Sequence, residues 1–335
     1  MSAKWYLGTG AQSDVVISTS IHVARNIREF PFPDRLSLPD KIKVNSVIKS
    51  AADTIEDYKF NYAEMKTLSQ SEVVSLAERH LVSPEFASSR DGRALLLTED
   101  ESVSIMLNEE DHIRLQVMLP GFALDEAYRT ADTIDTRLSG KLNFAFDEKL
   151  GYLTQDPTSL GTGMKASVIL HLPALVSSQQ IGALITTVSK LGLSLRGSYG
   201  EGAAAKGDLF RLSNTITLGI SEHNAIENLK AIALQIAARE RTAREELFKS
   251  PVIEDKIFRA YGILKYARLI DTAEFMELMS LVRLGAVRKL IALDCSAIEA
   301  LMIQMQPATI SLSVDRPLDR TERDKLRAER VRAQL

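Results

Sequence analysis

A run of three acids followed by an arginine can do chemistry on a charged substrate. Glu109, Glu110 and Asp111 lie between two stretches in which apolar and polar residues alternate, and Arg114 follows in the second stretch. Adjacent carboxylates can bind a cation such as a guanidinium or a magnesium ion, and a nearby guanidinium can bind an anion. A solvated acidic turn is the other interpretation of such a run, and these residues alone leave both open.

Two further segments are rich in small and hydroxyl-bearing residues. The first, residues 151–167, contains Lys165, and its backbone N–H groups together with this cation could bind an anion. The second, residues 196–207, begins with Arg196 and has the small side chains of a loop that could close over a ligand. Ordinary surface turns and loops have the same composition, so this alternative stays open as well.

The composition restricts the class of protein. The chain has 335 residues with 41 Lys and Arg against 44 Asp and Glu, and this near balance argues against a general nucleic-acid-binding protein. The single cysteine, Cys295, excludes an internal disulfide, and the 5 histidines offer few zinc ligands. The first residues do not resemble a signal peptide, and no apolar stretch of about 18 residues is present. We therefore expect a cytoplasmic protein with no membrane contact.

Strands and helices both contribute to the elements that would position these residues. Alternation over 103–107 and 113–117 predicts a β-hairpin that places His112, Arg114 and Gln116 on one face. Further strands are expected at 14–18, 94–98, 167–172, 193–196 and 209–212. Helices are expected at 46–81, 124–138, 177–191 and 225–248. Strands joined by hairpins as well as by helices predict a mixed α/β fold instead of a doubly wound parallel sheet.

After about Pro251 only helical patterns are found. We expect helices at 253–270, 272–284, 296–305 and 319–335, with Thr321 as a candidate cap of the last one. This change predicts a domain boundary near residue 250. Residues 1–250 would form one domain, with a short helical part at about 30–85, and residues 251–335 would form a helical second domain.

Several segments, taken in order, resemble the catalytic domain of the phosphagen kinases, the ATP:guanido phosphotransferases. They are residues 108–114, 150–154, 157–163 and 195–201. Three further segments are similar to the bacterial protein-arginine kinase (McsB-type) branch of this family. They are the Tyr-Gly-Glu-Gly segment at 199–202 in the candidate lid loop, residues 216–219, and residues 323–328 near the end of the chain. The resemblance implies an α+β catalytic domain with a mostly antiparallel sheet flanked by helices, followed by a helical C-terminal domain.

The activity that the resemblance implies is transfer of the γ-phosphoryl group of ATP, with Mg²⁺, to arginine side chains of client proteins. Glu110 would then be the main clamp and base, Glu201 the second carboxylate, Arg114 a catalytic cation, and Glu109 the magnesium holder through water. A guanidinium has a pKa above about 12 and is a poor nucleophile until carboxylates orient it and withdraw its proton. The nucleotide-binding residues that the resemblance implies are Ser18, Thr19, Ser20, Ile21, His22, His80, Arg114, Lys165, Ala166, Ser167, Val168, Ile169, Arg196, Gly197, Ser198, Tyr199, Gly200 and Glu201.

The chain departs from the pattern of this family at phosphate-binding positions. Ser20 and His22 stand where the family normally has two arginines, and Lys165 stands where it has another. Asp156 replaces a cysteine that is common in the family. Lysine keeps the charge of arginine but loses its bidentate fork. The sequence candidates for a replacement guanidinium are Arg25, Arg28, Arg90 and Arg93.

A second candidate site lies in the last helix. Arg323 and Arg327 are about one helical turn apart, with Asp324 beside them and Ala328 next in the chain. The resemblance implies an allosteric phosphoarginine-binding pocket formed by these four residues. A solvated terminal helix crossed by salt bridges is the alternative interpretation.

Three functions therefore stay open: an active protein-arginine kinase, a degenerate kinase that binds phosphoarginine or nucleotide, and a small-molecule guanidino kinase. The partners that the resemblance implies are client proteins with exposed arginines, a Clp-type AAA+ protease that degrades marked clients, and a zinc-binding activator protein. A homodimer is possible, because Met302 and Met305 have the helical spacing of core or dimer packing. Cys295 and His171 are expected to be structural residues in apolar surroundings.

Overall fold

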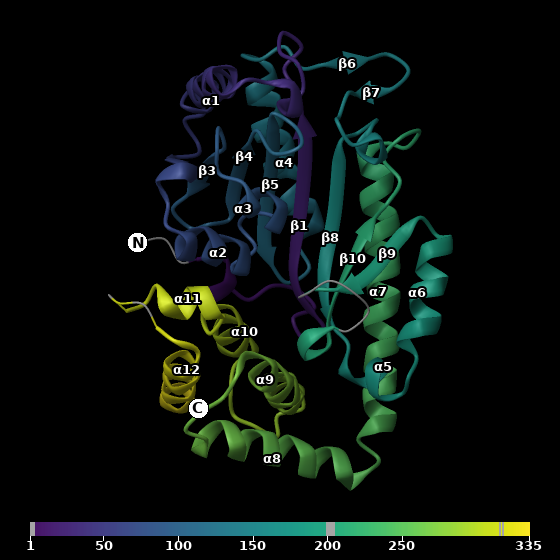
Figure 1. Ribbon diagram of the computed structural model, residues 1–335. Helices are drawn as coiled ribbons and strands as arrows, with labels where there is room; N and C mark the ends of the chain where they lie inside the picture. Colours follow the sequence, from purple (N-terminus) through teal and green to yellow (C-terminus); the bar gives the residue numbers. More distant parts are fainter. Residues whose placement is uncertain (1–3, 199–204, 315, 317) are drawn as a thin grey trace.

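The computed structural model describes residues 4–198, 205–314, 316 and 318–335. Its centre is an eight-stranded sheet with the strand order β2-β3-β4-β5-β1-β8-β10-β9 (Figure 1). All neighbouring strands of this sheet pair antiparallel. The predicted class, an antiparallel sheet flanked by helices, is confirmed.

The strands of the main sheet are β1 (Val16–Arg25), β2 (Phe60–Glu64), β3 (Ala94–Thr98), β4 (Val103–Leu107), β5 (Ile113–Pro120), β8 (Met164–His171), β9 (Leu193–Gly197) and β10 (Leu209–Asn214). A separate two-stranded sheet consists of β6 (Phe146–Asp147) and β7 (Gly151–Tyr152). The helices before residue 250 are α1 (Leu38–Ala52), α2 (Gln70–Glu78), α3 (Pro84–Ser88), α4 (Leu124–Ser139), α5 (Pro173–Ser177), α6 (Ile181–Lys190) and α7 (Glu222–Leu247). The helices after it are α8 (Pro251–Tyr266), α9 (Thr272–Val287), α10 (Cys295–Gln304), α11 (Pro307–Ser311) and α12 (Arg320–Gln334). Short 3-10 turns are η1 (Trp5–Leu7), η2 (Pro33–Arg35), η3 (Met65–Thr67), η4 (Pro157–Ser159) and η5 (Lys206–Asp208).

The two faces of the main sheet differ in chemistry. One face carries buried apolar residues such as Ile21 of β1, Leu115 of β5 and Val168 of β8, and α4 and α7 pack on it (Figure 1). The alternate residues of the same strands point to the other face, where Ser20, Arg114 and other polar side chains gather. Residues in a strand alternate between the two faces, so one pattern of sequence produces both surfaces.

The predicted helix over residues 46–81 is wrong. Helix α1 ends at Ala52, and the chain then forms the edge strand β2 before α2 begins after Ser69. Ser69 and Glu72 form a capping box that fixes this start, a local signal that outweighs the apolar periodicity around it. The first strand also extends further than expected, over Val16–Arg25, because its second half pairs on both sides with β5 and β8. The predicted helix over 177–191 corresponds to α6, Ile181–Lys190, and the separate short helix α5 precedes it.

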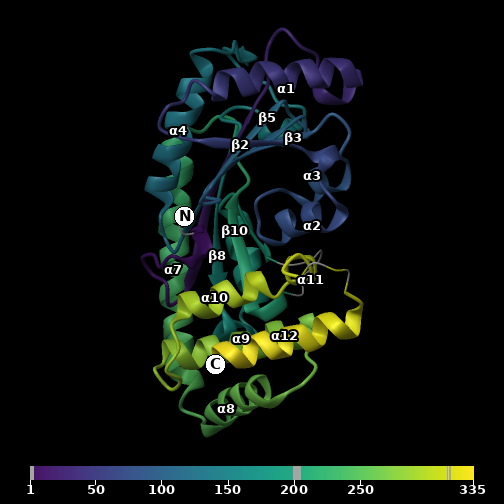
Figure 2. The same cartoon turned by 90° about the vertical axis from the view of Figure 1, so that its left-hand side faces the viewer.

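The helices α8–α12 gather at the end of the molecule opposite α1 (Figures 1 and 2). Met302 and Met305 lie in the core of this region and are each 2% exposed, so they serve core packing. Helix α12 begins with a capping box between Asp319 and Glu322, and Thr321 is not its cap. None of the helices in the described part of the chain is long and apolar enough to cross a membrane.

A buried arginine of α9 joins this helical region to the sheet. The guanidinium of Arg283, which is 0% exposed, donates to Glu299 Oε1 of α10 at 2.7 and 3.0 Å. It also donates to His171 Nδ1 of β8 at 2.9 Å and to the carbonyl oxygen of Ser13 at 2.6 Å. His171 is therefore structural, as the sequence predicts. Burial raises the pKa of Glu299, while its contact with Arg283 favours the charged form.

We expect Arg283→Ala to destabilise the protein by roughly 3–5 kcal/mol, because the substitution leaves the buried Glu299 carboxylate without its cation. Urea unfolding measured by circular dichroism gives the free energy of unfolding. The matched control is Arg259→Ala, which breaks an ion pair with Asp255 whose side chains are 75% and 60% exposed. The control should lose less than about 1 kcal/mol. Equal losses in the two variants would show that Arg283 does not hold the helical region to the sheet.

Candidate functional site

A cavity of about 410 Å³ lies on the polar face of the main sheet. Strands β1, β5, β8 and β10 form its floor, and residues of α2, α3 and the turn between them form a wall. Its described lining is His22, Ala77, His80, Val82, Ser83, Pro84, Glu85, Met106, Arg114, Gln116, Met118, Lys165, Ser167, Ser198, Arg211 and Ser213. Cations, hydroxyl groups and apolar side chains in one hollow fit a ligand with an anionic part and a flat apolar part.

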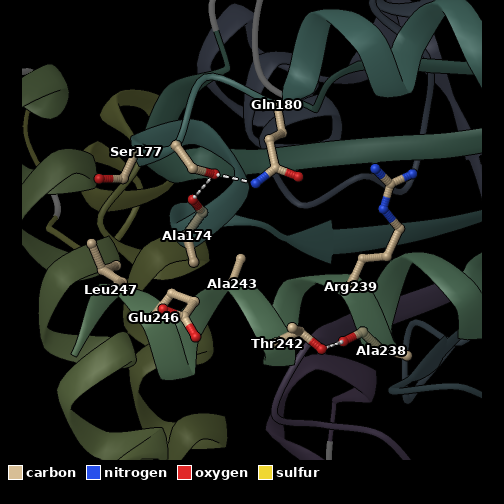
Figure 3. Close-up of a pocket in the computed structure, with 10 residues that line it drawn as sticks. Ala174, Ser177, Gln180, Ala238, Arg239, Thr242, Ala243, Glu246 and Leu247 are labelled. Carbon is tan, nitrogen blue, oxygen red and sulfur yellow. Dashed lines mark hydrogen bonds between the residues drawn. The ribbon is translucent and has the colours of Figure 1, made fainter. Parts of the chain in front are cut away.

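A second groove of about 550 Å³ lies between α5 and α7, away from this cavity (Figure 3). The side chains of Arg239 and Glu246 of α7 line this groove, together with small residues such as Ala174 and Ala243. None of the residues that the sequence assigns to chemistry lines this groove. The polar cavity is therefore the candidate site.

The hairpin of β4 and β5 delivers an ion pair to the cavity. Arg114 Nη1 donates to Glu109 Oε2 at 2.7 Å, and the side chain of Glu109 is 1% exposed. Ser83 also donates its hydroxyl to Glu109 from the wall. These contacts fix the direction of Arg114. The predicted hairpin is thus confirmed, and Arg114 and Gln116 share its polar face, whereas the ring of His112 is buried away from the cavity lining.

Glu110, the adjacent acid, is exposed next to this ion pair. Partial burial and the negative charges of Glu109 and Asp156 raise the pKa of Glu110, and Arg114 opposes them. A carboxylate with a raised pKa is a better proton acceptor than an ordinary one. Glu110 is therefore exposed, and its pKa is shifted in the direction that favours proton uptake.

A buried network holds the acidic turn in place. Asp111 Oδ1 accepts from Asn26 Nδ2 at 2.5 Å and from the backbone N–H of Gln155 at 2.9 Å. His112 Nδ1 accepts from the backbone N–H of Ile27 at 3.0 Å, and its Nε2 lies 2.8 Å from the carbonyl oxygen of Pro31. This pair of contacts requires the neutral tautomer with the proton on Nε2. Sequence reasoning named Asp111 and His112 but not their partners Asn26, Ile27, Pro31 and Gln155, because these lie in separate segments of the chain.

Positive charge converges around His22 at the floor of the cavity. Burial, followed by the charges of Arg114, Arg211 and Lys165, holds the pKa of His22 well below its usual value. Burial and Arg211 likewise lower the pKa of His80 to about 3. Both histidines are therefore neutral at pH 7, and the lysine and arginines supply the charge.

The four arginines that the sequence proposed as replacements do not reach this cavity. Arg25 is 1% exposed and donates to Asp135 at 2.7 Å. Arg28, Arg90 and Arg93 donate to backbone carbonyl oxygens at 2.7, 2.8 and 2.6 Å, and none of the four is in the described lining. The cation that sequence reasoning missed is Arg211. A signal was available, because Arg211 stands at an alternate position of the predicted strand 209–212.

The other predicted nucleotide-binding residues fall into three groups. Ser20 and Ser167 lie on the polar face with their hydroxyl oxygens 2.7 Å apart, and Ser198 lines the cavity. Arg196 of β9 stands opposite Arg211 of β10 in the backbone register of these two strands. A second group lies outside the described lining of the cavity. Ile21, Ala166 and Val168 face the core between the sheet and its helices, and Ile169 packs towards the helical region. Thr19 donates to the carbonyl oxygen of Gly121, and Ser18 and Gly197 are also absent from the lining. The third group, Tyr199, Gly200 and Glu201, lies outside the described residues.

The donor set for magnesium is sparse. No group of three or more histidine, cysteine or carboxylate side chains that could hold a metal occurs in the ranges described. Glu109, behind the lining, already contacts Arg114, and Glu85 is the acid of the described lining. Magnesium is commonly bound by one or two carboxylates, by water and by substrate phosphates. Both carboxylate oxygens of Glu109 already accept hydrogen bonds, from Ser83 and Arg114, and its side chain is 1% exposed, so Glu85 is the more accessible acid for an ion that arrives with the phosphates.

The C-terminal candidate residues are close together, but their roles differ. Arg327 is 1% exposed, and its guanidinium donates to Asp324 at 2.7 Å and to the carbonyl oxygens of Met305 and Ile270 at 2.9 and 2.7 Å. Ala328 is 0% exposed in the helical core. Arg323 is partly exposed on the same helix. Arg327 therefore stabilises the fold of this region, and Arg323 is the accessible cation of the group.

Comparisons with known proteins agree with this geometry. Residues 43–243 match the model of the ATP:guanido phosphotransferase C-terminal catalytic domain, which is more than half of the chain. The chain belongs to the ATP:guanido phosphotransferase family. Residues 250–335 match the model of the protein-arginine kinase McsB C-terminal domain. The family that the sequence suggests is therefore confirmed.

Full-length relatives extend the likeness over the whole chain. The chain is 44% identical to the protein-arginine kinase of Caldanaerobacter subterraneus over 96% of this chain and 97% of the relative. It is 42% identical to that of Moorella thermoacetica over 100% of this chain and 97% of the relative.

Solved structures show the same architecture. The duplicated taurocyamine kinase of Schistosoma mansoni, with bound transition-state analogue components, superposes with a TM-score of 0.61 at 26% identity. That match covers 68% of this chain and 33% of the duplicated one. Lombricine kinase superposes with a TM-score of 0.61 at 22% identity over 75% of this chain and 73% of its own, which supports the fold alone.

Acid should destabilise the turn through His112. Burial lowers the pKa of His112 from 6.5 to about 4. As the pH falls from 6.5 towards 4, the His112 side chain therefore takes up a proton in the unfolded chain but not yet in the folded one. Stability contributed by the neutral ring is complete above pH 6.5 and declines as the pH falls towards 4. We expect about 2 kcal/mol of this contribution to disappear between pH 7.5 and 5.

Urea unfolding at these two pH values measures the effect against His112→Gln, which keeps an acceptor and a donor but does not titrate in this range. The variant should lose about 2 kcal/mol less than the unmodified protein on acidification. The exposed His223→Gln serves as control and should follow the unmodified protein. Parallel curves for the unmodified protein and His112→Gln would contradict the neutral-ring assignment.

Proposed function

We propose that this protein is a protein-arginine kinase that transfers the γ-phosphoryl group of ATP, with Mg²⁺, to arginine side chains of client proteins. The observation that carries the proposal is the exposed Glu110, with its raised pKa, next in the chain to the Glu109–Arg114 ion pair whose arginine lines the cation-lined cavity. The relatives that match the whole chain at 42–44% identity are protein-arginine kinases, and this supports protein as the acceptor. A small-molecule guanidino kinase is the competing function.

The reaction needs a base, an orienting carboxylate and positive charge. The acceptor guanidinium binds against Glu110, which takes a proton from the attacking nitrogen. That nitrogen forms a bond to the γ-phosphorus, the bond from the γ-phosphorus to the oxygen bridging to the β-phosphorus breaks, and ADP leaves with this oxygen. Arg114 and Lys165 offset the negative charge of the phosphoryl group during transfer. The second carboxylate in this proposal is Glu201. The rest of the rate enhancement would come from holding the acceptor nitrogen and the γ-phosphorus in the reactive geometry.

We expect Glu110→Gln to reduce ATP-dependent phosphoarginine formation on a protein acceptor by about 100-fold or more, because the amide cannot accept the proton. Mass spectrometry of casein or another arginine-rich protein incubated with enzyme, ATP and Mg²⁺ measures the product. Glu56→Gln, at an exposed acid outside the site, is the matched control and should retain activity. Unfolding midpoints of both variants should equal that of the unmodified protein.

Three results would redirect the proposal. Unchanged product from Glu110→Gln would remove Glu110 from the mechanism. Phosphorylation of free arginine in preference to protein would favour the small-molecule kinase. Binding of nucleotide without any phosphoarginine from the unmodified protein would favour the degenerate, binding-only function.

The setting of the reaction is a further part of the proposal. Phosphorylated clients would pass to a Clp-type AAA+ protease in the cytoplasm, and a zinc-binding activator protein would stimulate the kinase. The match of residues 250–335 to the protein-arginine kinase C-terminal domain supports this setting. The lone Cys295, buried enough to raise the pKa of its thiol, is consistent with a reducing compartment.

The C-terminal region would bind phosphoarginine through Arg323, Asp324, Arg327 and Ala328. Arg323 would bind the phosphate, while Asp324 would face the guanidinium of the ligand and is itself held by Arg327 at 2.7 Å. Because Arg327 also donates to two buried carbonyl oxygens, replacing it would disturb the fold as well as the site.

We therefore expect Arg323→Ala to weaken the binding of a phosphoarginine-containing peptide about 10-fold or more, since one charge-assisted contact to phosphate is lost. Isothermal titration calorimetry measures the affinity, with the unphosphorylated peptide as reference. Lys325→Ala, an exposed cation on the same helix, is the control and should bind as the unmodified protein does. Equal affinities for Arg323→Ala and the control would reject the pocket.

A further inference from the structure

We propose that Arg211 of β10 binds the phosphate chain of the nucleotide, together with Lys165 and Arg114. This inference rests on the proposed kinase function for the identity of its ligand. It adds a residue outside the set that the sequence motifs indicate.

The position of Arg211 follows from the register of the sheet. Phe210 and Leu212, the residues on either side of it, are 3% and 0% exposed and belong to the core between the sheet and its helices. The alternation of the strand therefore turns Arg211 to the polar face, where it lines the cavity. Its Nη1 atom lies 3.5 Å from the hydroxyl oxygen of Ser167 on β8.

Arg211 acts electrostatically on two opposite parts of the cavity. Its charge contributes to the lowered pKa of His22 on β1 and also to that of His80, which follows α2. His22, His80 and Arg211 all line the same cavity. Lys165 and Arg114 act on His22 as well, so the three positive charges surround one volume.

Among the described residues that line the cavity, Glu85 is the acid. Glu109 pairs with Arg114 at 2.7 Å, and Glu85 is an exposed acid at the rim. Two buried polar atoms of the cavity, His22 Nδ1 and Ser198 Oγ, have no hydrogen-bond partner among the described residues. Buried polar groups in a native fold are generally satisfied, so these atoms also point to a polar ligand.

Arginine suits this task better than the residues around it. Its planar fork can donate two parallel hydrogen bonds to phosphate oxygens, whereas Lys165 is a point charge and neutral His22 carries none. Ser20 and Ser167, whose hydroxyl oxygens are 2.7 Å apart on the adjacent strands, are uncharged. Arg114 and Arg211 are the two guanidinium groups of the described lining, and Arg211 brings its fork from the side of β10.

Isothermal titration calorimetry of the full-length protein with adenosine, AMP, ADP and ATP tests the assignment. We expect Arg211→Gln to weaken ATP and ADP binding about 10- to 100-fold, while adenosine binding changes less than about twofold. Arg211→Lys should fall between these limits, because it keeps the charge and loses the fork. The matched control is Arg239→Gln on α7, whose side chain lies in the separate groove of Figure 3.

The outcomes separate this inference from the kinase function. Arg211→Gln that binds ATP within twofold of the unmodified protein overturns the inference, and so does an equal loss for adenosine and ATP or a lowered unfolding midpoint without ligand. If the unmodified protein binds ATP and makes no phosphoarginine, the kinase function fails while the loss on Arg211→Gln still supports the inference. An unmodified protein that binds none of the four ligands overturns both.

Discussion

The alternation of side chains along antiparallel strands is the constraint on which both the core and the candidate site depend. Each strand in the middle of the sheet sends one set of residues to α4 and α7 and the other set to the cavity. A shift of β1 by one residue along β8 would turn His22 into the core and Ile21 to the polar face while β8 kept its orientation. The cost of burying such polar groups fixes the register, and the register places the site.

A cluster of positive charge is the main electrostatic property of the site. Arg114 is oriented by Glu109, and Lys165 and Arg211 line the same cavity with hydroxyl groups and two neutral histidines. In a partly enclosed cavity such charges interact more strongly than they do in water, because the local dielectric constant is lower. An anionic ligand therefore gains most where the protein has the fewest acids of its own. Glu110 lies at the edge of this field, where a cationic acceptor can approach a polyanionic donor.

The helical region after residue 250 contributes to the same sheet through buried polar contacts. Arg283 of α9 donates to His171 on β8, and His171 lies 2.9 Å from Ser280. Ser280 in turn donates to Asp208 at 2.7 Å, just before β10 begins. This chain of contacts runs from the C-terminal helices to the strand that carries Arg211. Helices of this region and strands of the catalytic region therefore share one set of buried hydrogen bonds, which makes their relative placement specific.

Local patterns in the sequence determined the strands at 94–98 and 103–107, the acidic hairpin turn, the helices α4 and α7 and the family, because period and turn chemistry act over a few residues. They failed over residues 46–81, where a capping box and strand pairing outweigh the apolar period. Only the tertiary structure showed that Arg25 is paired with Asp135, that Arg327 is internal and that Arg211 reaches the cavity. The physical reason is that a charged side chain is positioned by partners far away in the chain, and the register that brings these partners together is set by the packing of the whole sheet.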